Sequence, residues 1–114
     1  MTGALRPAAI ADMVEVFKAM SDPVRLELFT RIVDVPEMSC TQLVKEAEVS
    51  ASTVSYHVKI LKTAGLVAVR KQGRNYYYTA RSEALEHLRD LFVDLSATGR
   101  ANTAASPAEL RPDA

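Results

Sequence analysis

The chain has 114 residues, of which 48% are hydrophobic and 25% are charged, a balance typical of one globular domain with a modest core. No apolar run approaches the roughly 20 residues that span a bilayer, and the N-terminus lacks the charged-then-apolar layout of a secretory signal. The single cysteine, Cys40, excludes an internal disulfide. We therefore expect a cytoplasmic protein that does not enter a membrane.

The formal net charge is zero, but the charges are distributed unevenly along the chain. From Val49 to Ser82 there is no Asp or Glu, whereas six Lys and Arg residues lie there, so this segment carries +6 and the remainder −6. A segregated basic segment in a balanced protein is the electrostatic pattern of a nucleic-acid binder. Solvated basic faces are also common, so charge alone leaves the partner open.

Two helices are predicted before Pro36 breaks the chain. The first spans residues 10–20, where apolar residues recur with helical spacing: Ile10, Met13, Val14, Phe17 and Met20. Asp22 as N-cap and Pro23 in the first turn start the second helix, which covers residues 24–33. Its residues expected to be buried are Leu26, Phe29 and Val33.

A helix-turn-helix is predicted next. A short helix spans residues 41–47, Val49 and Ser50 form a tight turn, and Ser50 or Ser52 caps a helix that ends at Ala64 before Gly65. At 100° per residue its buried stripe comprises Val54, Val58 and Leu61. The opposite face bears hydroxyls and one cation but no acid: Ser52, Ser55, Tyr56 and Lys59. Such a face suits the edges of bases and phosphates.

His57 lies at the edge of the buried stripe, and its position leaves two roles open. It is either a packed histidine that orients the helix or a contact to a phosphate.

The periodicity then changes to that of a β-hairpin. Residues 66–70 and 75–79 are rich in β-branched and aromatic residues and flank a four-residue tip, residues 71–74. Arg70, Lys71, Gln72 and Arg74 lie on or beside this tip, where a wing reaches the DNA backbone or the minor groove. The run Tyr76, Tyr77 and Tyr78 suggests base stacking, but alternation along a strand favours core packing for at least one of them.

A last helix is predicted from Ser82 to about Ala97. The resulting fold is mainly α (α+β), with five helices and a two-stranded β-hairpin wing. We expect one DNA-binding and dimerisation domain over residues 10–97, a flexible N-terminus over residues 1–9 and a disordered tail over residues 98–114.

Three segments carry a family resemblance. FKAMSDPVRLEL (17–28) resembles the opening of ArsR/SmtB-family repressors, SASTVSYHVKILKTAGLV (50–67) resembles their recognition helix, and RKQGRNYYY (70–78) resembles their wing. The resemblance implies a winged helix-turn-helix, an obligate homodimer formed by the first and last helices, and repression relieved by an effector. Ala51 departs from the family, since glutamine often occupies its position.

The resemblance does not extend to the metal boxes of the family. Where the third helix of many members reads Glu-Leu-Cys-Val-Cys-Asp-Leu, this chain has EMSCTQL (37–43), with hydroxyl residues at both ligand positions. A lone Cys40 is therefore expected to be a small buried apolar residue. The second site of the family, on the last helix, aligns with residues that do not form such a site: Ser82, Ala84, Leu95 and Thr98.

An acidic stripe on the last helix offers weak metal candidates in place of these boxes. Glu83, His87 and Asp90, with Asp94, share one helical face, and their nitrogen and oxygen atoms suit nickel or zinc. The apolar face is centred elsewhere on the helix, which favours a solvated acidic stripe: Leu88, Leu91, Phe92 and Leu95.

The sequence thus predicts a sequence-specific regulator of transcription that binds double-stranded DNA, a repressor controlled by an effector. The effector class stays open between an atypical metal, a small organic ligand, oxidation of Cys40 and a partner protein. The alternative is a winged-helix module that binds protein, which the acid-free segment disfavours. No nucleophile–base pair or phosphate loop indicates an enzyme. The candidate DNA-binding residues are Ser50, Ser52, Thr53, Ser55, Tyr56, His57, Lys59, Arg70, Lys71, Gln72 and Arg74.

Overall fold

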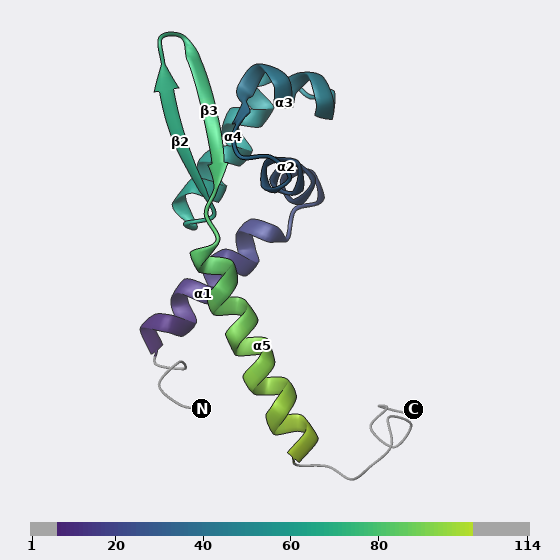
Figure 1. The fold of residues 1–114 in the computed structure, drawn as a ribbon, viewed down its shortest axis with the longest axis vertical. Helices are drawn as coiled ribbons and strands as arrows, with labels where there is room; N and C mark the ends of the chain where they lie inside the picture. The colour runs from purple at the N-terminus through teal and green to yellow at the C-terminus, as the bar shows by residue number, and fades with distance from the viewer. Residues whose placement is uncertain (1–6, 102–114) are drawn as a thin grey trace.

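The computed structural model describes residues 7–101. Along the chain lie α1 (Pro7–Met20), α2 (Pro23–Val33), β1 (Met38–Ser39), α3 (Cys40–Ala47), α4 (Ala51–Thr63), β2 (Val67–Gln72), β3 (Asn75–Ala80) and α5 (Glu83–Ala101). The β2–β3 hairpin projects at one end of an elongated molecule, and α1 and α5 form the other end (Figure 1). The predicted mainly helical winged helix-turn-helix is confirmed, with its five helices.

Two helix boundaries differ from the prediction. Helix α1 begins at Pro7, three residues before the predicted start, so residues 7–9 are helical. Helix α5 continues to Ala101, beyond its predicted end at about Ala97. The apolar periodicity ends before that point, but a helix propagates from its preceding turns until a residue opposes it. Residues 1–6 and 102–114, the rest of the two predicted flexible ends, lie outside the described residues.

Local capping defines the helix-turn-helix. Asp22 caps α2 by accepting a hydrogen bond from the backbone N–H of Arg25 at 2.9 Å. Helix α3 ends at Ala47 with Glu48 as its C-cap, whose φ of 56° is left-handed, and Ser50 rather than Ser52 is the N-cap of α4. Gly65 follows α4 with a φ of 81°, as expected for a glycine at the end of a helix.

The wing belongs to a three-stranded sheet of order β1-β3-β2. The additional strand, β1, pairs with β3 in antiparallel register, with Met38 opposite Tyr78. A two-residue strand is too short to show alternation, which is why the sequence did not reveal it. The predicted four-residue tip is also wrong: Gln72 pairs with Asn75, so the turn has only two residues. Gly73 supplies the positive φ, 62°, that such turns favour.

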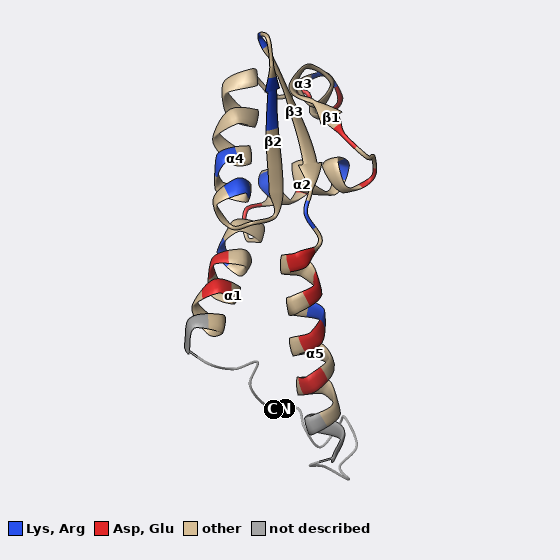
Figure 2. Ribbon diagram, turned by 60° about the vertical axis from the view of Figure 1, so that its left-hand side comes forward, with Lys and Arg blue, Asp and Glu red and all other residues tan. Residues whose placement is uncertain are grey.

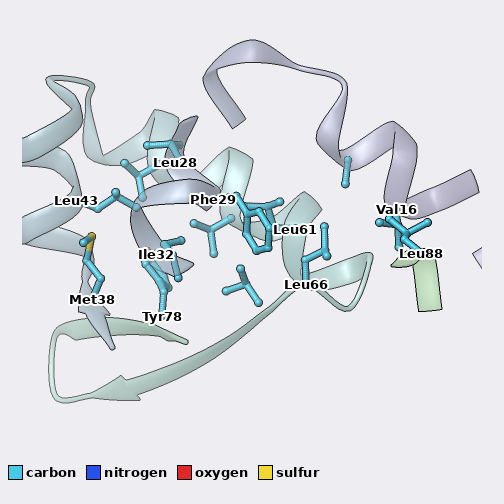
Figure 3. Packing of buried hydrophobic residues seen from close by; sticks show 14 residues of the cluster. Val16, Leu28, Phe29, Ile32, Met38, Leu43, Leu61, Leu66, Tyr78 and Leu88 are labelled. Carbon is cyan, nitrogen blue, oxygen red and sulfur yellow. The ribbon is translucent and has the colours of Figure 1, made fainter. Parts of the chain in front are cut away.

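The core lies between α2, α3, α4 and the sheet (Figure 3). Its largest fully buried side chains are Leu28, Ile32, Leu43, Leu61, Leu66, Val54 and Val67. Phe29 is buried as predicted, but Leu26 and Val33 are exposed. The buried face of α2 follows residues 25, 28, 29 and 32 instead. Because Arg25 occupies one of these positions, choosing only apolar residues selected the wrong stripe.

Helices α1 and α5 bury little of their apolar surface within the chain. Val16 of α1 and Leu88 of α5 are buried, whereas Phe17 is 42% and Phe92 is 53% exposed. The rings of Phe17 and Phe92 lie 6.1 Å apart. The predicted buried face of the last helix is therefore only partly covered, since Leu95 is exposed as well. Over residues 7–101 no helix is long and apolar enough to cross a membrane.

Candidate nucleic-acid interface

Helix α4 presents the exposed polar face that the sequence predicted. Val54, Val58 and Leu61 are buried, which confirms the predicted stripe. The side chains of the opposite face are exposed: Ser52, Ser55, Tyr56 and Lys59. Tyr56 is the most prominent of them, with 62% of its surface exposed. This face offers hydroxyl donors, hydroxyl acceptors and one cation, the chemistry that reads base edges and neutralises phosphate.

The first turn of α4 is ordered by hydroxyl groups. The Oγ of Ser50 accepts from the Thr53 backbone N–H at 3.1 Å and donates to the Thr53 Oγ1 at 2.8 Å. It also lies 3.1 Å from the Oγ of Ser52. No acidic residue lies in this turn, so the positive end of the helix dipole is not compensated by a carboxylate there. An approaching phosphate would meet hydroxyls and backbone N–H groups here.

His57 is buried, with only 8% of its surface exposed. Its Nδ1 lies 3.1 Å from Nη1 of Arg25 in α2. This position supports the packed, helix-orienting alternative for His57 over a phosphate contact. The sequence assigned no role to Arg25, although an arginine at a core position of α2 is the kind of exception that signals a buried polar contact.

The wing separates its polar side chains between two faces. Strand alternation places Lys71 on the same face as Val69, and Arg70 with Gln72 on the other. Lys71 and Arg74 are exposed, and the Nζ of Lys71 lies 5.7 Å from the centre of the Tyr76 ring. Tyr78 is 2% exposed, which confirms the predicted core packing for this tyrosine.

Arg70 is not a free cation. It donates to both oxygens of Glu37 at 2.8 and 3.1 Å and to Oε1 of Gln72 at 2.6 Å, and its guanidinium lies 4.4 Å from the centre of the Tyr77 ring. The hydrogen bond and the charge of Arg70 lower the pKa of Glu37. The contact between Glu37 and Arg70 was not predicted from the sequence, because local patterns do not indicate a pair of residues 33 positions apart.

The charges are partly separated in space as well as along the chain. Figure 2 shows Lys and Arg on α4 and β2 and Asp and Glu along α1 and α5, with further acidic residues on α3 and in the segment before β1. The predicted basic segment thus occupies the helix-turn-helix end of the molecule, and the acidic stripe occupies the other end. A basic recognition helix beside a basic hairpin is the electrostatic footprint of a DNA-binding surface.

The acidic stripe of α5 faces a groove between α1 and α5. Glu83, His87 and Asp90 line this groove of about 630 Å³ together with Asp12 and Glu15 of α1. Arg81 neutralises part of it through an ion pair with Glu83 at 3.0 Å. Among residues 7–101 no three His, Cys, Asp or Glu side chains lie close enough together to hold a metal ion.

Cys40 begins α3 and packs against the core, but it is only half-buried and not buried as the sequence predicted. Burial is the main cause of a raised pKa of Tyr78, and the neighbouring Cys40 adds to it.

Residues 20–70 match the family model of a helix-turn-helix domain. The HTH-type transcriptional regulator YceK of Bacillus subtilis is 37% identical over 73 residues, covering 63% of this chain and 73% of that protein. A homolog of the transcriptional repressor SmtB from Synechocystis is 36% identical over 84 residues, 74% of this chain and 61% of the homolog.

A solved structure, an ArsR-like transcriptional regulator from Rhodococcus sp. RHA1, superposes with a TM-score of 0.65 at 25% identity and covers 86% of this chain and 99% of that one. The fold, the segregated basic surface and these similarities agree with the resemblance seen in the sequence. The chain belongs to the ArsR/SmtB family of helix-turn-helix transcriptional regulators, which are not enzymes.

Proposed function

We propose that this regulator is a homodimeric repressor that binds double-stranded operator DNA through α4 and the β2–β3 wing and is released by an effector. The observation that carries the proposal is the exposed, acid-free face of α4 beside a basic hairpin (Figure 2). The contacts proposed for α4 are Ser50, Ser52, Thr53, Ser55, Tyr56 and Lys59. The contacts proposed for the wing are Lys71, Gln72 and Arg74.

The two elements have different tasks in this proposal. Helix α4 enters the major groove, where Ser55 and Tyr56 meet base edges and Lys59 meets a phosphate. Lys71 and Arg74 reach the backbone or the minor groove and supply affinity that is independent of sequence. Arg70 joins them only by exchanging the carboxylate of Glu37 for a phosphate, because both oxygens of Glu37 already bind it.

A second copy of the chain would cover the exposed apolar surface of α1 and α5. A groove of about 680 Å³ there is lined by Met20, Leu85, Leu88, Arg89, Phe92, Val93, Ser96 and Ala97. A continuous apolar surface of this kind is the usual mark of a protein interface. A dimer built on it would carry two reading helices for successive major grooves of a two-fold operator.

The proposed repression follows from occupying a promoter, and the SmtB homolog is named a repressor. The effector would act at the end of the molecule remote from the wing, where α1 and α5 enclose their groove. A small molecule, a metal or a partner protein each fits this placement. Such a regulator works where the chromosome is, which for a bacterial or archaeal cell is the cytoplasm.

Footprinting on the DNA upstream of its own gene tests the proposal, combined with transcription from that promoter in vitro. We expect a protected two-fold site and less transcript as protein is added. Protection with more transcript would make the protein an activator. Absence of protection at any upstream site, with binding to a protein partner instead, would favour the protein-interaction alternative.

A further inference from the structure

A single buried arginine connects three elements of the fold. Arg25, in the first turn of α2, is 8% exposed. Its Nε and Nη2 donate to the carbonyl oxygens of Ala19 and Lys18 at the end of α1. Its Nη1 lies 3.1 Å from Nδ1 of His57 in the middle of α4. One guanidinium therefore ties the C-terminus of α1 to α4. We call the exposed polar face of α4, formed by Ser52, Ser55, Tyr56 and Lys59, its reading face.

The chemistry of arginine decides the protonation of the histidine. A guanidinium has five N–H donors and no acceptor, so Nδ1 of His57 must be the acceptor of this hydrogen bond. The imidazole is then neutral and carries its proton on Nε2. A ring protonated on Nδ1 would direct an N–H at the N–H of Arg25, which no hydrogen bond can satisfy.

The location of His57 on α4 gives this contact influence over the reading face. Tyr56 directly precedes His57, and the two rings pack edge to face with centroids 5.1 Å apart and planes at 68°. While His57 is buried, Tyr56 is 62% exposed. A rotation of α4 that broke the bond to Arg25 would therefore turn Tyr56 by the same angle.

The other end of the connection lies beside the exposed apolar surface. Lys18 directly follows Phe17, whose ring contacts Phe92 of α5 at a centroid distance of 6.1 Å. A displacement of α1 against α5 would thus move the carbonyl oxygens that hold Arg25. The chain of contacts runs from α5 through α1 and Arg25 to α4.

We propose that Arg25 and His57 are positioning residues for DNA binding. Their hydrogen bond sets the reading face of α4 relative to the end of α1, and His57 does not itself touch DNA. This inference rests on the proposed DNA-binding function. Removing the acceptor leaves a buried guanidinium N–H without a partner, which α4 relieves only by shifting.

Two substitutions of His57 separate positioning from direct contact. In place of histidine, the side-chain amide of asparagine occupies the position of Nδ1, whereas the longer side chain of glutamine carries its amide to the position of Nε2. If His57 acts through Arg25, His57→Asn retains operator affinity within about threefold and His57→Gln loses about tenfold or more. If His57 instead contacts phosphate through Nε2, glutamine is the variant that is tolerated. Fluorescence anisotropy with a labelled operator duplex measures both.

The tautomer is read independently on the wild-type protein by ¹⁵N NMR of the His57 ring. We expect an unprotonated Nδ1 and a protonated Nε2 near neutral pH. A protonated Nδ1 overturns the inference, and this result does not depend on whether either variant folds. The inference requires that wild type and His57→Asn both bind the operator more tightly than His57→Gln. Any other order of affinities also overturns it. A wild-type protein that binds no duplex would instead refute the proposed function itself.

Discussion

Arg70 in β2 holds both carboxylate oxygens of Glu37, at 2.8 and 3.1 Å, although 33 positions separate the two residues. The guanidinium lies over the ring of Tyr77 in the intervening strand, 4.4 Å from its centre. A bidentate arginine–carboxylate pair fixes geometry as well as charge. The segment before β1 is thereby tied to the far strand of the wing, and one positive charge of the wing is neutralised within the protein.

Glu37→Gln is expected to strengthen binding to duplex DNA of any sequence. The amide leaves the charge of Arg70 available to a phosphate, so the plot of log affinity against log salt should steepen by up to about 1. Titrations over about 50 to 200 mM salt measure this slope.

The matched control is Glu15→Gln, which removes the same charge from an exposed ion pair with Lys18 on α1. This control should leave the salt slope unchanged. Equal slopes for both variants would show that net charge alone is responsible, and weaker binding by Glu37→Gln would show that the pair supports the bound form.

The same pair predicts a pH dependence of stability. Because the folded protein lowers the pKa of Glu37, its stabilisation is present above the ordinary pKa of glutamate and is lost as the pH falls through the lowered value. The difference in melting temperature between wild type and Glu37→Gln should therefore shrink on acidification. A difference that stays constant down to the acid transition would contradict the assignment.

Substitutions in the wing and in α4 should have different effects on DNA binding. Lys71→Ala and Arg74→Ala should weaken operator and random duplexes alike and flatten the salt slope by about 1 each. Ser55→Ala and Tyr56→Ala should mainly reduce discrimination, by roughly 1–3 kcal/mol for each base that α4 no longer reads. Competition binding between operator and random duplex separates the two effects. Altered sequence preference in the wing variants, with none in the α4 variants, would reverse the proposed roles.

The dimer is expected to depend on the exposed apolar surface of α5. Val93→Asp places a charge in the proposed interface and should yield monomers with weak operator binding, because a buried unpaired carboxylate is costly. Val33→Asp is the matched control, since Val33 is 47% and Val93 is 59% exposed. Sedimentation velocity distinguishes the species. A wild-type monomer at micromolar concentration with intact operator binding would refute the dimer.

A response to nickel or zinc is expected to depend on His87 and not on Cys40. His87 contributes an imidazole to the acidic stripe that lines the groove between α1 and α5, whereas Cys40 packs against the core. A site of two or three ligands from one chain would be weak unless a second chain completed its shell. Calorimetry should show that His87→Ala abolishes any heat of binding and Cys40→Ser preserves it. Tight binding with the reverse dependence would restore the thiol as the sensor.

Local signals predicted the elements well, and contacts between distant residues were the ones missed. Asp22 and Ser50 lie at the caps where their side-chain chemistry placed them. The buried stripe of α2 was misjudged because Arg25 occupies a core position and its acceptors come from α1 and α4. Strand β1 and the Glu37 ion pair depend on tertiary pairing with the hairpin, for which a two-residue strand gives no periodicity.

Equilibrium binding of the wild-type protein to its operator and to a shuffled duplex, across a range of salt, tests the central claim most directly. Affinity for both duplexes should fall steeply and linearly in log–log form, because phosphate contacts release counterions. The operator should remain preferred at every salt concentration, because the contacts of α4 to bases do not depend on released ions. Binding that is insensitive to salt, or equal for the two duplexes, would contradict a regulator that reads DNA through α4 and the wing.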